Sequence, residues 1–565
     1  MTEPLIRRRP AGTDDVNWPA SMPRLLQRLY AARGVRDPGQ VDHRLARLMR
    51  PDGLGDLERA AALLQEAIAQ QRSILVVGDY DCDGATGCAV AVRGLRMLGA
   101  QQVDFAVPDR RLHGYGLSPS LLDSLPVMPD MVVTVDNGIA AHSGVAEARR
   151  RGARVIITDH HLPAATLPEA DAIVNPNLPG DGFASKALAG VGVMFYLLLA
   201  LRARLDSKAD LASLLDLVAL GTVADMVPLD DNNRILVAAG LQRMRNGRAC
   251  TGVRALAEAA SRSMDTLSSA DIGFALAPRL NAAGRLENMR LGIECLLSDD
   301  PAAATSMAQH LSAINQERRE LQADMLAEAE KIVDTLADSS GDGVVVYQPH
   351  WHPGVVGLVA SRLKERLHRP VVAFAPAGNG DGTLRGSARS IAGVHVRDVL
   401  VAVAARSPGL IPRFGGHAMA AGLELAQADL DLFAEHFDAV IGELIDDDVR
   451  QAVLWTDGEL PAADISMQSA QAVRSAGPWG QAFPLPLFDN VFVCEQQRSM
   501  GQGGRHRRLR LRDPRSNHVH EGVMFNTGSD LPMQTPLRVV YELTVNEWNG
   551  RQSLQLLLRH VAEAV

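Results

Sequence analysis

Three aspartates stand within five residues in the segment SILVVGDYDCDGATG. Asp79, Asp81 and Asp83 directly follow an apolar run of the kind that forms a buried strand. Three like charges this close repel one another unless a cation lies among them. Hard divalent ions such as Mg²⁺ and Mn²⁺ prefer carboxylate oxygen, so the spacing indicates a metal site where the strand ends.

The local geometry of this segment can also be predicted. In an extended segment, alternate side chains share one face, which would put Asp79, Asp81 and Asp83 together and turn Tyr80 and Cys82 away. A bend at Gly84 would then let Asp83 reach a second ion.

Further acidic and imidazole groups follow other predicted strands. Asp136 ends VVTVDNG, the trio Asp159, His160 and His161 ends VIITDHH, and Asp225 lies in GTVADMVP. Two ions roughly 3.5–4 Å apart would suit in-line attack on phosphorus, and imidazole among the ligands favours Mn²⁺.

A plainer interpretation exists for each residue alone. An Asp after a strand is usually a turn or helix N-cap residue, Asp-Gly is an ordinary turn dipeptide, and a His pair is more often structural. Four clusters, three of them at the ends of neighbouring strands, favour the metal site over this interpretation.

The elements that must position these groups alternate between short β-branched runs and helical segments over residues 51–230. The runs are SILVV, QVDFAV, DMVVTV, RVIIT and DAIVN. This alternation predicts a parallel sheet covered by helices, which binds ligands at the carboxyl ends of its strands.

The rest of the chain divides into four segments of different character. Residues 1–50 form a small N-terminal appendage with a helical patch, and residues 231–340 are helical. Residues 341–450 read as a second mixed α/β segment, and residues 451–565 as short strands that suggest a barrel or sandwich. An apolar stripe predicts a long connecting helix rather than a coiled-coil dimer seam; it comprises Ile314, Leu321, Met325, Ile332 and Leu336.

Composition limits the class of protein. The chain has 565 residues, a formal charge of −9 and five scattered cysteines without a CxxC pair, which argues against a generally basic coat, a disulfide framework and a thiolate zinc site. The N-terminus has no apolar signal region, and the longest apolar stretch, VGVMFYLLLAL, is too short to span a bilayer. We therefore expect a soluble cytoplasmic protein without a membrane segment.

The motifs DYDCDG, VDNG and TDHH, in this order, resemble the DHH phosphoesterase superfamily. Within it the chain is similar to the bacterial single-strand-specific 5′→3′ DNA exonucleases, through PDRRLHGYGLS, GTVADMVPL, APRLNAAGRL, WHPGVVGLVASRL, GSARS and GGHAMAAGL. The resemblance implies an α/β multidomain fold: a DHH parallel-sheet domain, a long connecting helix, a DHHA1 α/β domain that binds substrate, and a C-terminal OB-like β-barrel that binds nucleic acid.

The resemblance also implies a role for each acidic and imidazole group. The metal ligands would be Asp79, Asp81, Asp83, Asp136, His160 and Asp225, holding two Mn²⁺ or Mg²⁺ ions, with Asp136 as the bridge. His161 would face the scissile phosphate, and Asp159 would orient a ligand from behind.

Substrate recognition is expected in several motifs. In the family, residues matching Arg110, Ser387 and Arg389 form a pocket for a 5′ phosphate, with Tyr115 nearby. A hydroxyl and guanidinium forks suit that group. A second set of residues either holds a sugar-phosphate track or serves structure, and the resemblance favours the track: Arg279, Asn281, Arg285, His352 and His417. For Arg389 and the histidines, an ordinary structural role is the alternative.

The segment GGRHRRLRLRD carries an arginine cluster without an acid before its end. Alternating Arg and Leu predicts one charged strand face, and Trp548 in NEWNG lies at a turn-like position. Such a face with an aromatic nearby suits sequence-independent single-strand binding, although a solvated strand face is the alternative. The expected DNA-binding residues are Arg505, Arg507, Arg508, Arg510 and Trp548. The segment GPWGQAFPLPLF departs from the family wording and is expected to be a structural turn.

The expected function is metal-dependent hydrolysis of single-stranded DNA from the 5′ end to mononucleotides, in repair and recombination. The expected partners are single-stranded DNA with a 5′ phosphate, a helicase and a single-strand-binding protein, and the chain is expected to be a monomer. Two alternatives stay open: a DHH phosphodiesterase for small oligonucleotides or cyclic dinucleotides, and a catalytically inactive DNA-binding scaffold.

Overall fold

The computed structural model describes residues 3–12, 15–109, 112–335, 341–378, 380, 382–501, 504–527, 530–548 and 551–564. The chain forms two compact units. The larger comprises Arg7–Gly284, Asn288–Ser312 and Trp455–Val565, and the smaller Met1–Ile6, Arg285–Glu287 and Ala313–Leu454. Within the described ranges, each helix is too short or too polar to cross a membrane.

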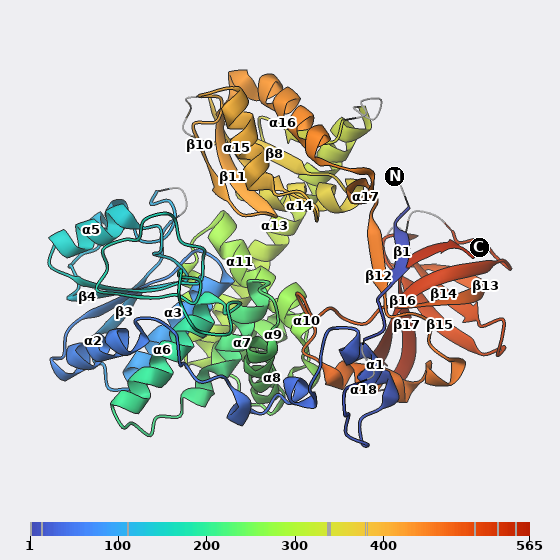
Figure 1. Cartoon of the computed structure of the whole chain (residues 1–565), viewed down its shortest axis with the longest axis horizontal. Coiled ribbons are helices and arrows are strands. Elements are labelled where there is room, and N and C mark those ends of the chain that lie inside the picture. Colours follow the sequence, from blue (N-terminus) through green and yellow to red (C-terminus); the bar gives the residue numbers. More distant parts are fainter. Residues whose placement is uncertain are drawn as a thin grey trace. The chain divides into compact units, whose positions relative to one another are not determined.

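The larger unit contains the predicted parallel sheet, with strand order β3-β2-β4-β5-β6 (Figure 1). Its strands are β2 (Ile74–Val77), β3 (Val103–Ala106), β4 (Met131–Val135), β5 (Arg154–Thr158) and β6 (Ala172–Val174). All neighbours pair in parallel. The chain runs from β2 to β3 on one side and then returns to β4 on the other, so the order reverses between β2 and β4. Ligands bind at such a switch point in open α/β sheets.

Helices cover both faces of this sheet, as the alternation predicts. Its helices are α2 (Leu57–Ala69), α3 (Cys82–Met97), α4 (Pro119–Asp123), α5 (His142–Arg150), α6 (Gly190–Arg204) and α7 (Leu215–Ala224). Residues of α4 and α5 pack with Val132, Val155 and Ile157 on one face. On the other face α3 and α6 lie so close that a Cβ on Gly94 would collide with Leu198.

A helical region follows the sheet, as expected from the sequence. It contains α8 (Asp231–Arg245), α9 (Thr251–Ala259), α10 (Ser269–Asp271), the π-helical turn η5 (Ile272–Leu276), α11 (Ala277–Leu286), α12 (Arg290–Leu297) and α13 (Pro301–Thr335). The long α13 carries the predicted apolar stripe, of which Ile314 and Met325 are buried. Leu336 of that stripe lies outside the described residues.

The smaller unit is built on a mixed sheet of order β10-β11-β9-β8-β7, in which only β7 and β8 pair in parallel among the described strands. Its strands are β7 (Val344–Tyr347), β8 (Val371–Pro376), β9 (Thr383–Arg389), β10 (Arg413–Gly416) and β11 (Ala420–Ala426). Its helices are α14 (Val356–Leu367), α15 (Val396–Arg406), α16 (Leu430–Leu444) and α17 (Asp447–Arg450). The α15 and α16 helices pack on one face of the sheet and α14 on the other.

The C-terminal strands close into a barrel of order β13-β14-β15-β17-β16, drawn in orange to red in Figure 1. They are β13 (Phe488–Met500), β14 (His506–Arg512), β15 (Val519–Met524), β16 (Pro536–Trp548) and β17 (Arg551–Glu563). The helix α18 (Met467–Ala476) precedes the barrel and shares its core. The sequence predicted a barrel or a sandwich for this segment, and the structure is a barrel. The division at residues 50, 230, 340 and 450 stays a prediction.

From Arg7 on, the N-terminal segment belongs to the larger unit. Its elements are β1 (Leu5–Arg8), which pairs with β12 (Val453–Thr456), and α1 (Arg24–Ala31). Leu29 of α1 packs in the barrel's core cluster, and the Tyr30 hydroxyl donates to the carbonyl of Ala476 at 2.8 Å. The ends of the chain are thus folded together.

Candidate active site

The three carboxylates after β2 do not share one extended segment, because Asp83 is already helical, so that prediction is wrong. The helix α3 begins at Cys82, and Asp81 is its N-cap, with a side chain that accepts from the Gly84 N–H at 3.0 Å. The capping bond turns the chain into a helix at once. Asp83 therefore lies in the first helical turn.

Asp83 is fixed by a neighbouring helix. Its two carboxylate oxygens accept the backbone N–H groups of Gly190 at 2.6 Å and Val191 at 3.0 Å, at the start of α6. A helix N-terminus stabilises negative charge, so α6 holds this buried carboxylate in one orientation.

Asp136 follows β4 with an unusual backbone. Its φ is +61°, a left-handed conformation that few residues other than Gly, Asn and Asp adopt. The buried side chain of Asn137 donates to the carbonyls of Val77 and Val135, both at 2.9 Å, and so ties the ends of β2 and β4 together. Tyr115 donates to the Asp136 carbonyl at 3.1 Å. These bonds hold Asp136 at the switch point.

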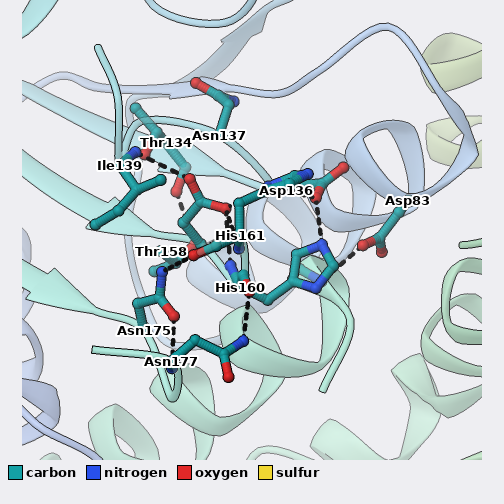
Figure 2. Close-up of polar contacts among 12 residues, drawn as sticks. Asp83, Thr134, Asp136, Asn137, Ile139, Thr158, His160, His161, Asn175 and Asn177 are labelled. Atoms are coloured by element: carbon teal, nitrogen blue, oxygen red, sulfur yellow. Dashed lines mark hydrogen bonds and ion pairs between the residues drawn. The ribbon is translucent and has the colours of Figure 1, made fainter. Parts of the chain in front are cut away.

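The two histidines after β5 project beside Asp136 (Figure 2). Asp159 accepts the backbone N–H of Ile139 with one oxygen and approaches Nδ1 of His161 with the other, at 2.9 and 2.8 Å. The carbonyls of His160 and His161 accept from the side chains of Asn177 and Asn175, at 2.5 and 2.9 Å. Asp159 thus orients His161, as a residue behind a ligand would.

Asp225 completes the arrangement from the carboxyl end of α7. Nε2 of His160 lies 3.1 Å from Oδ1 of Asp136 and 3.4 Å from Oδ2 of Asp225. Three triads of ligand atoms lie within 4.8 Å of one another. They are Asp136–His160–His161, Asp83–His160–Asp225 and Asp79–Asp81–Asp136. The triads share Asp136 and His160, so they form one continuous group of candidate metal ligands.

Burial and mutual repulsion shift the ionisation of these groups. Burial, with the charge of Asp81, raises the pKa of Asp83 to about 7. Burial, followed by the charges of Asp83 and Asp81, raises the pKa of Asp136 and of Asp225 well above the usual range. Burial opposes ionisation of Asp159 as well, but the hydrogen bond and charge of His161, the Ile139 N–H and the charge of His160 together outweigh it, so the pKa of Asp159 is lowered. The cluster therefore needs positive charge to stay ionised.

The available atoms fit divalent ions. Oδ1 of Asp136 and Oδ2 of Asp225 are shielded from water, and within the described residues neither accepts a hydrogen bond; each only lies near Nε2 of His160. Buried polar atoms are normally bonded. Carboxylate oxygens suit both Mg²⁺ and Mn²⁺, and the imidazole nitrogen of His160 favours Mn²⁺ of the two.

Glycines allow the close packing around these ligands. A Cβ on Gly190 would lie 2.5 Å from the Cβ of Asp136, and one on Gly84 would lie 2.5 Å from the backbone nitrogen of Asp79. Such distances do not occur between real atoms, so these backbones approach the ligand segments only because they lack a side chain.

Arg279 and Asn281, expected on a substrate track, make structural bonds. The Arg279 guanidinium donates to Ser312 Oγ and to the carbonyls of Ala275 and Ala259. Oδ1 of Asn281 accepts the Cys82 N–H at 2.8 Å, at the start of α3. Asn281 therefore supports the helix that carries Asp83.

The remaining predicted substrate residues lie in the smaller unit or outside the described residues. Arg285 donates to the Gly354 carbonyl at 3.3 Å, and Nδ1 of His352 accepts the Gly354 N–H at 3.1 Å. The exposed His417 follows β10, with its backbone N–H bonded to the Ala420 carbonyl. Arg110 lies outside the described residues.

Ser387 and Arg389 lie side by side in the smaller unit. Nη1 of Arg389 donates to Ser387 Oγ at 2.8 Å. A Cβ on Gly357 would lie 2.8 Å from Nη2 of Arg389 and 2.9 Å from Ser387 Oγ. The first turn of α14 therefore lies against both side chains, and helix N-termini attract anions.

The barrel confirms the predicted alternation on β14. Leu509 and Leu511 are fully buried, while Arg508 and Arg510 are exposed. Arg508 is paired with Glu521 at 3.0 Å. Two further arginines predicted to bind DNA differ in their exposure. Arg505 is exposed, whereas the Arg507 side chain is 11% exposed and paired with Asp530. Trp548 ends β16 rather than lying in the turn, and its side chain is outside the described part.

Sequence reasoning missed the amides that support the site. Asn137, Asn175 and Asn177 brace the backbone around the ligands, and the N–H groups of α6 hold Asp83. The asparagines in VDNG and VNPN stand directly after predicted strands. Their position at the strand ends could have identified them as supports of the site.

The chain resembles known proteins over almost its whole length. Three family models match: "DHH family, N-terminal domain" at residues 73–222, "DHHA1 domain" at 340–443 and "RecJ OB domain" at 456–560. The single-stranded-DNA-specific exonuclease RecJ of Dickeya dadantii is 48% identical, with 98% of each chain covered. That of Escherichia coli is 45% identical over 99% of this chain and 100% of the relative.

Solved structures extend the comparison to the fold and the metal. RecJ of Thermus thermophilus in complex with Mn²⁺ matches with a TM-score of 0.79 at 33% identity, covering 98% of this chain and 80% of that one. The same protein with Mg²⁺ matches with a TM-score of 0.74. The chain belongs to the RecJ family of single-stranded-DNA-specific exonucleases.

Proposed function

We propose that this chain is a metal-dependent exonuclease that hydrolyses single-stranded DNA from its 5′ end and releases mononucleotides. The observation that carries the proposal is the convergence of buried carboxylates and His160 at the switch point of the sheet. The relatives named as single-stranded-DNA-specific exonucleases cover nearly the whole chain. We infer that it serves DNA repair and recombination.

The residues that would hold two Mn²⁺ or Mg²⁺ ions are Asp79, Asp81, Asp83, Asp136, His160 and Asp225. When bound, the ions supply positive charge that lowers the pKa of water and stabilises the charge that develops on the phosphate. Asp136 and His160 each belong to two of the ligand triads, and of the two only Asp136 has a carboxylate, whose two oxygens can serve two ions. We therefore assign Asp136 to the position between them.

The other residues of the site position groups. The contact between Nδ1 of His161 and Asp159 sets the ring's orientation, and we assign His161 to the scissile phosphate. The T-shaped contact between Tyr115 and His161 supports a place for Tyr115 beside the same phosphate. Asn281 keeps the start of α3 in place for Asp83.

We assign Ser387 and Arg389 to the 5′ phosphate. Their support is a hydroxyl and a guanidinium beside the first turn of α14, a combination that suits a terminal phosphate. Arg110, Arg279, Arg285, His352 and His417 remain proposed contacts of the sugar-phosphate chain, of which Arg279 is the weakest because its donors serve backbone carbonyls.

We assign the exposed arginines of the barrel to the single strand beyond the site. Arg505, Arg508 and Arg510 would contact phosphates without reading sequence, with Arg507 and Trp548 beside them. We further propose a cytoplasmic monomer that receives its strand from a helicase or a single-strand-binding protein.

The test compares wild-type protein with Asp136→Asn on a long 5′-phosphorylated single strand and on a dinucleotide, with Mn²⁺. The expected result is rapid release of mononucleotides from the long strand by the wild type and none by the variant. Asp104→Asn, at an exposed aspartate on β3, is the matched control and should keep full activity. Cleavage of the dinucleotide alone, or equal activity of the wild type and Asp136→Asn, would refute the proposal.

A further inference from the structure

A second charged cavity lies in the larger unit, away from the carboxylate cluster. Its volume is about 400 Å³. It is lined by the last turns of α3, the start of α7 with the preceding 3₁₀ turn η3 (Leu211–Leu214), the end of α8, the first residue of α9 and the end of α12. Four arginines stand in its wall: Arg93, Arg96, Arg243 and Arg248.

Three of these arginines are anchored through part of their guanidinium. Arg93 donates to the Leu296 carbonyl and to Asp299, Arg96 donates to the Val103 carbonyl, and Arg243 donates to the Arg248 carbonyl. A guanidinium has five N–H donors, so these bonds fix the side chains and leave further donors. A preorganised donor set loses little freedom when it binds.

The wall carries more positive than negative charge. Asp299 is the one carboxylate among its described lining residues, and its side chain is 82% exposed. Asp216 lies behind the wall, fully buried, and accepts the Cys250 N–H at 2.6 Å. Four guanidinium groups facing two carboxylates leave a surplus of positive charge, which favours an anion.

The helix α9 also begins at the cavity, and its N-cap Cys250 makes no side-chain capping bond. The first N–H groups of a helix lack acceptors within the helix and attract anions. An anion in the cavity would therefore accept from the start of α9 as well as from the arginines.

The cavity also has an apolar part. Met97, Leu214, Leu217 and Leu297 line it beside the arginines. An elongated ligand with a charged end and a flat, less polar end fits this division, and the volume is within the range of small-molecule sites. We propose that this cavity binds a nucleotide, with its phosphates on the four arginines and its base against the leucines and Met97.

The cavity is connected to the metal centre by two helices. Asp83 lies in the first turn of α3 and Arg93 ten residues on. Asp225 follows α7, and Leu214 precedes it. At 1.5 Å rise per residue, the two sites lie roughly 15 Å apart along each helix. A nucleotide in the cavity is therefore separate from any phosphate held at the metals.

The experiment measures ADP binding to the full chain by calorimetry in EDTA, so that metal-held phosphate does not contribute. We expect saturable one-to-one binding that Arg248→Glu weakens by about tenfold or more. Arg248 is exposed, and thermal unfolding checks that the variant folds. If Arg248→Glu does not fold, the milder Arg248→Gln replaces it and should weaken ADP binding to a smaller extent. Arg59→Glu, at an exposed arginine on α2, is the control and should bind as the wild type does.

The outcomes separate this proposal from its competitors. Binding that is unchanged in Arg248→Glu and Arg248→Gln, or lost in Arg389→Gln instead, would overturn it. Inorganic phosphate binding as tightly as ADP would reduce the site to a simple anion site and refute the nucleotide. If a short oligonucleotide displaces ADP from the wild type but does not bind this site in the Arg248 variants, the cavity binds DNA and the nucleotide proposal is refuted. Nuclease activity tests the metal centre independently, since Arg248 is not part of it.

Discussion

The glycine that begins α6 offers a direct test of how tightly the metal centre is packed. Gly190 donates its N–H to Asp83, and a Cβ added to it would lie 2.5 Å from the Cβ of Asp136 and 2.7 Å from its Cα. Ordinary carbon contacts begin near 3.5 Å. The change Gly190→Ala must therefore move Asp136 or α6 by about 1 Å.

The expected effect on catalysis is much larger than that on stability. A displacement of about 1 Å from productive geometry costs about 100-fold in rate, whereas overpacking typically costs about 1–3 kcal/mol of stability. We expect kcat on a 5′-phosphorylated single strand to fall about 100-fold. Thermal and urea unfolding should remain cooperative, and single-strand affinity should be preserved because the barrel and the smaller unit are untouched.

Gly192→Ala is the matched control on the same helix. Its added Cβ would meet only the end of the flexible Leu188 side chain, at 3.1 Å, so that side chain needs to yield by only a few tenths of an ångström. This variant should keep its activity within about threefold, because repacking of one side chain leaves Asp136 in place. A fully active Gly190→Ala, or equal losses in both variants, would show that Asp136 does not need the position described here.

Three further predictions concern stability. Burial, with the charge of Arg234, lowers the pKa of His43 to about 4. As pH falls below 6.5, His43 therefore binds its proton in the unfolded chain before it does so in the folded one, which destabilises the folded state. Between pH 6.5 and pH 4 the free energy of unfolding of the wild type, measured in urea, should fall by about 3 kcal/mol more than that of His43→Gln. Equal decreases in the two proteins would contradict this. The side chains of the pair Arg33–Asp457 are 1% and 2% exposed. Arg33→Met should therefore lower the free energy of unfolding by about 3–5 kcal/mol, because it leaves a buried carboxylate without its partner. As a control, Asp42→Asn should have little effect on stability, because Asp42 pairs with Arg44 at the surface. Adding Mn²⁺ at about 100 times its Kd to EDTA-treated protein should stabilise it by about 2.7 kcal/mol, and Asp225→Asn should reduce that gain; an equal gain would remove Asp225 from the ligands.

Much of the sheet and of its metal centre could be predicted from the sequence. The runs SILVV, DMVVTV and RVIIT became β2, β4 and β5 because their β-branched residues fit a buried strand. Since parallel strands end at one edge, the aspartates after β2 and β4 had to come close.

The conformation of the segment after β2 could not be predicted in the same way. Whether Asp83 continues a strand or enters a helix depends on the Asp81 cap and on the N–H groups of Gly190 and Val191, which are more than 100 residues away. The bond from Cys82 to Asn281 spans 199 residues. Local propensity does not contain such contacts.

The glycine-rich strands of the smaller unit could not be predicted from the sequence either. The segments that form β9, β10 and β11 contain Gly386, Gly415 and Gly422, and glycine reads as a strand breaker in sequence. They are strands because they pair with one another across the sheet, and the same pairing brings Ser387 beside Gly422.

The joining of the chain's two ends has a consequence for its synthesis. Arg33 bonds Asp457, 424 residues later, and Leu29 has no complete core until the barrel strands exist. At about 5–20 residues per second on the ribosome, roughly 20–90 s pass before the partner of the N-terminal helix is made. The helix α1 therefore completes its packing only after the barrel has been made, and a chain truncated before the barrel would leave α1 exposed to proteases.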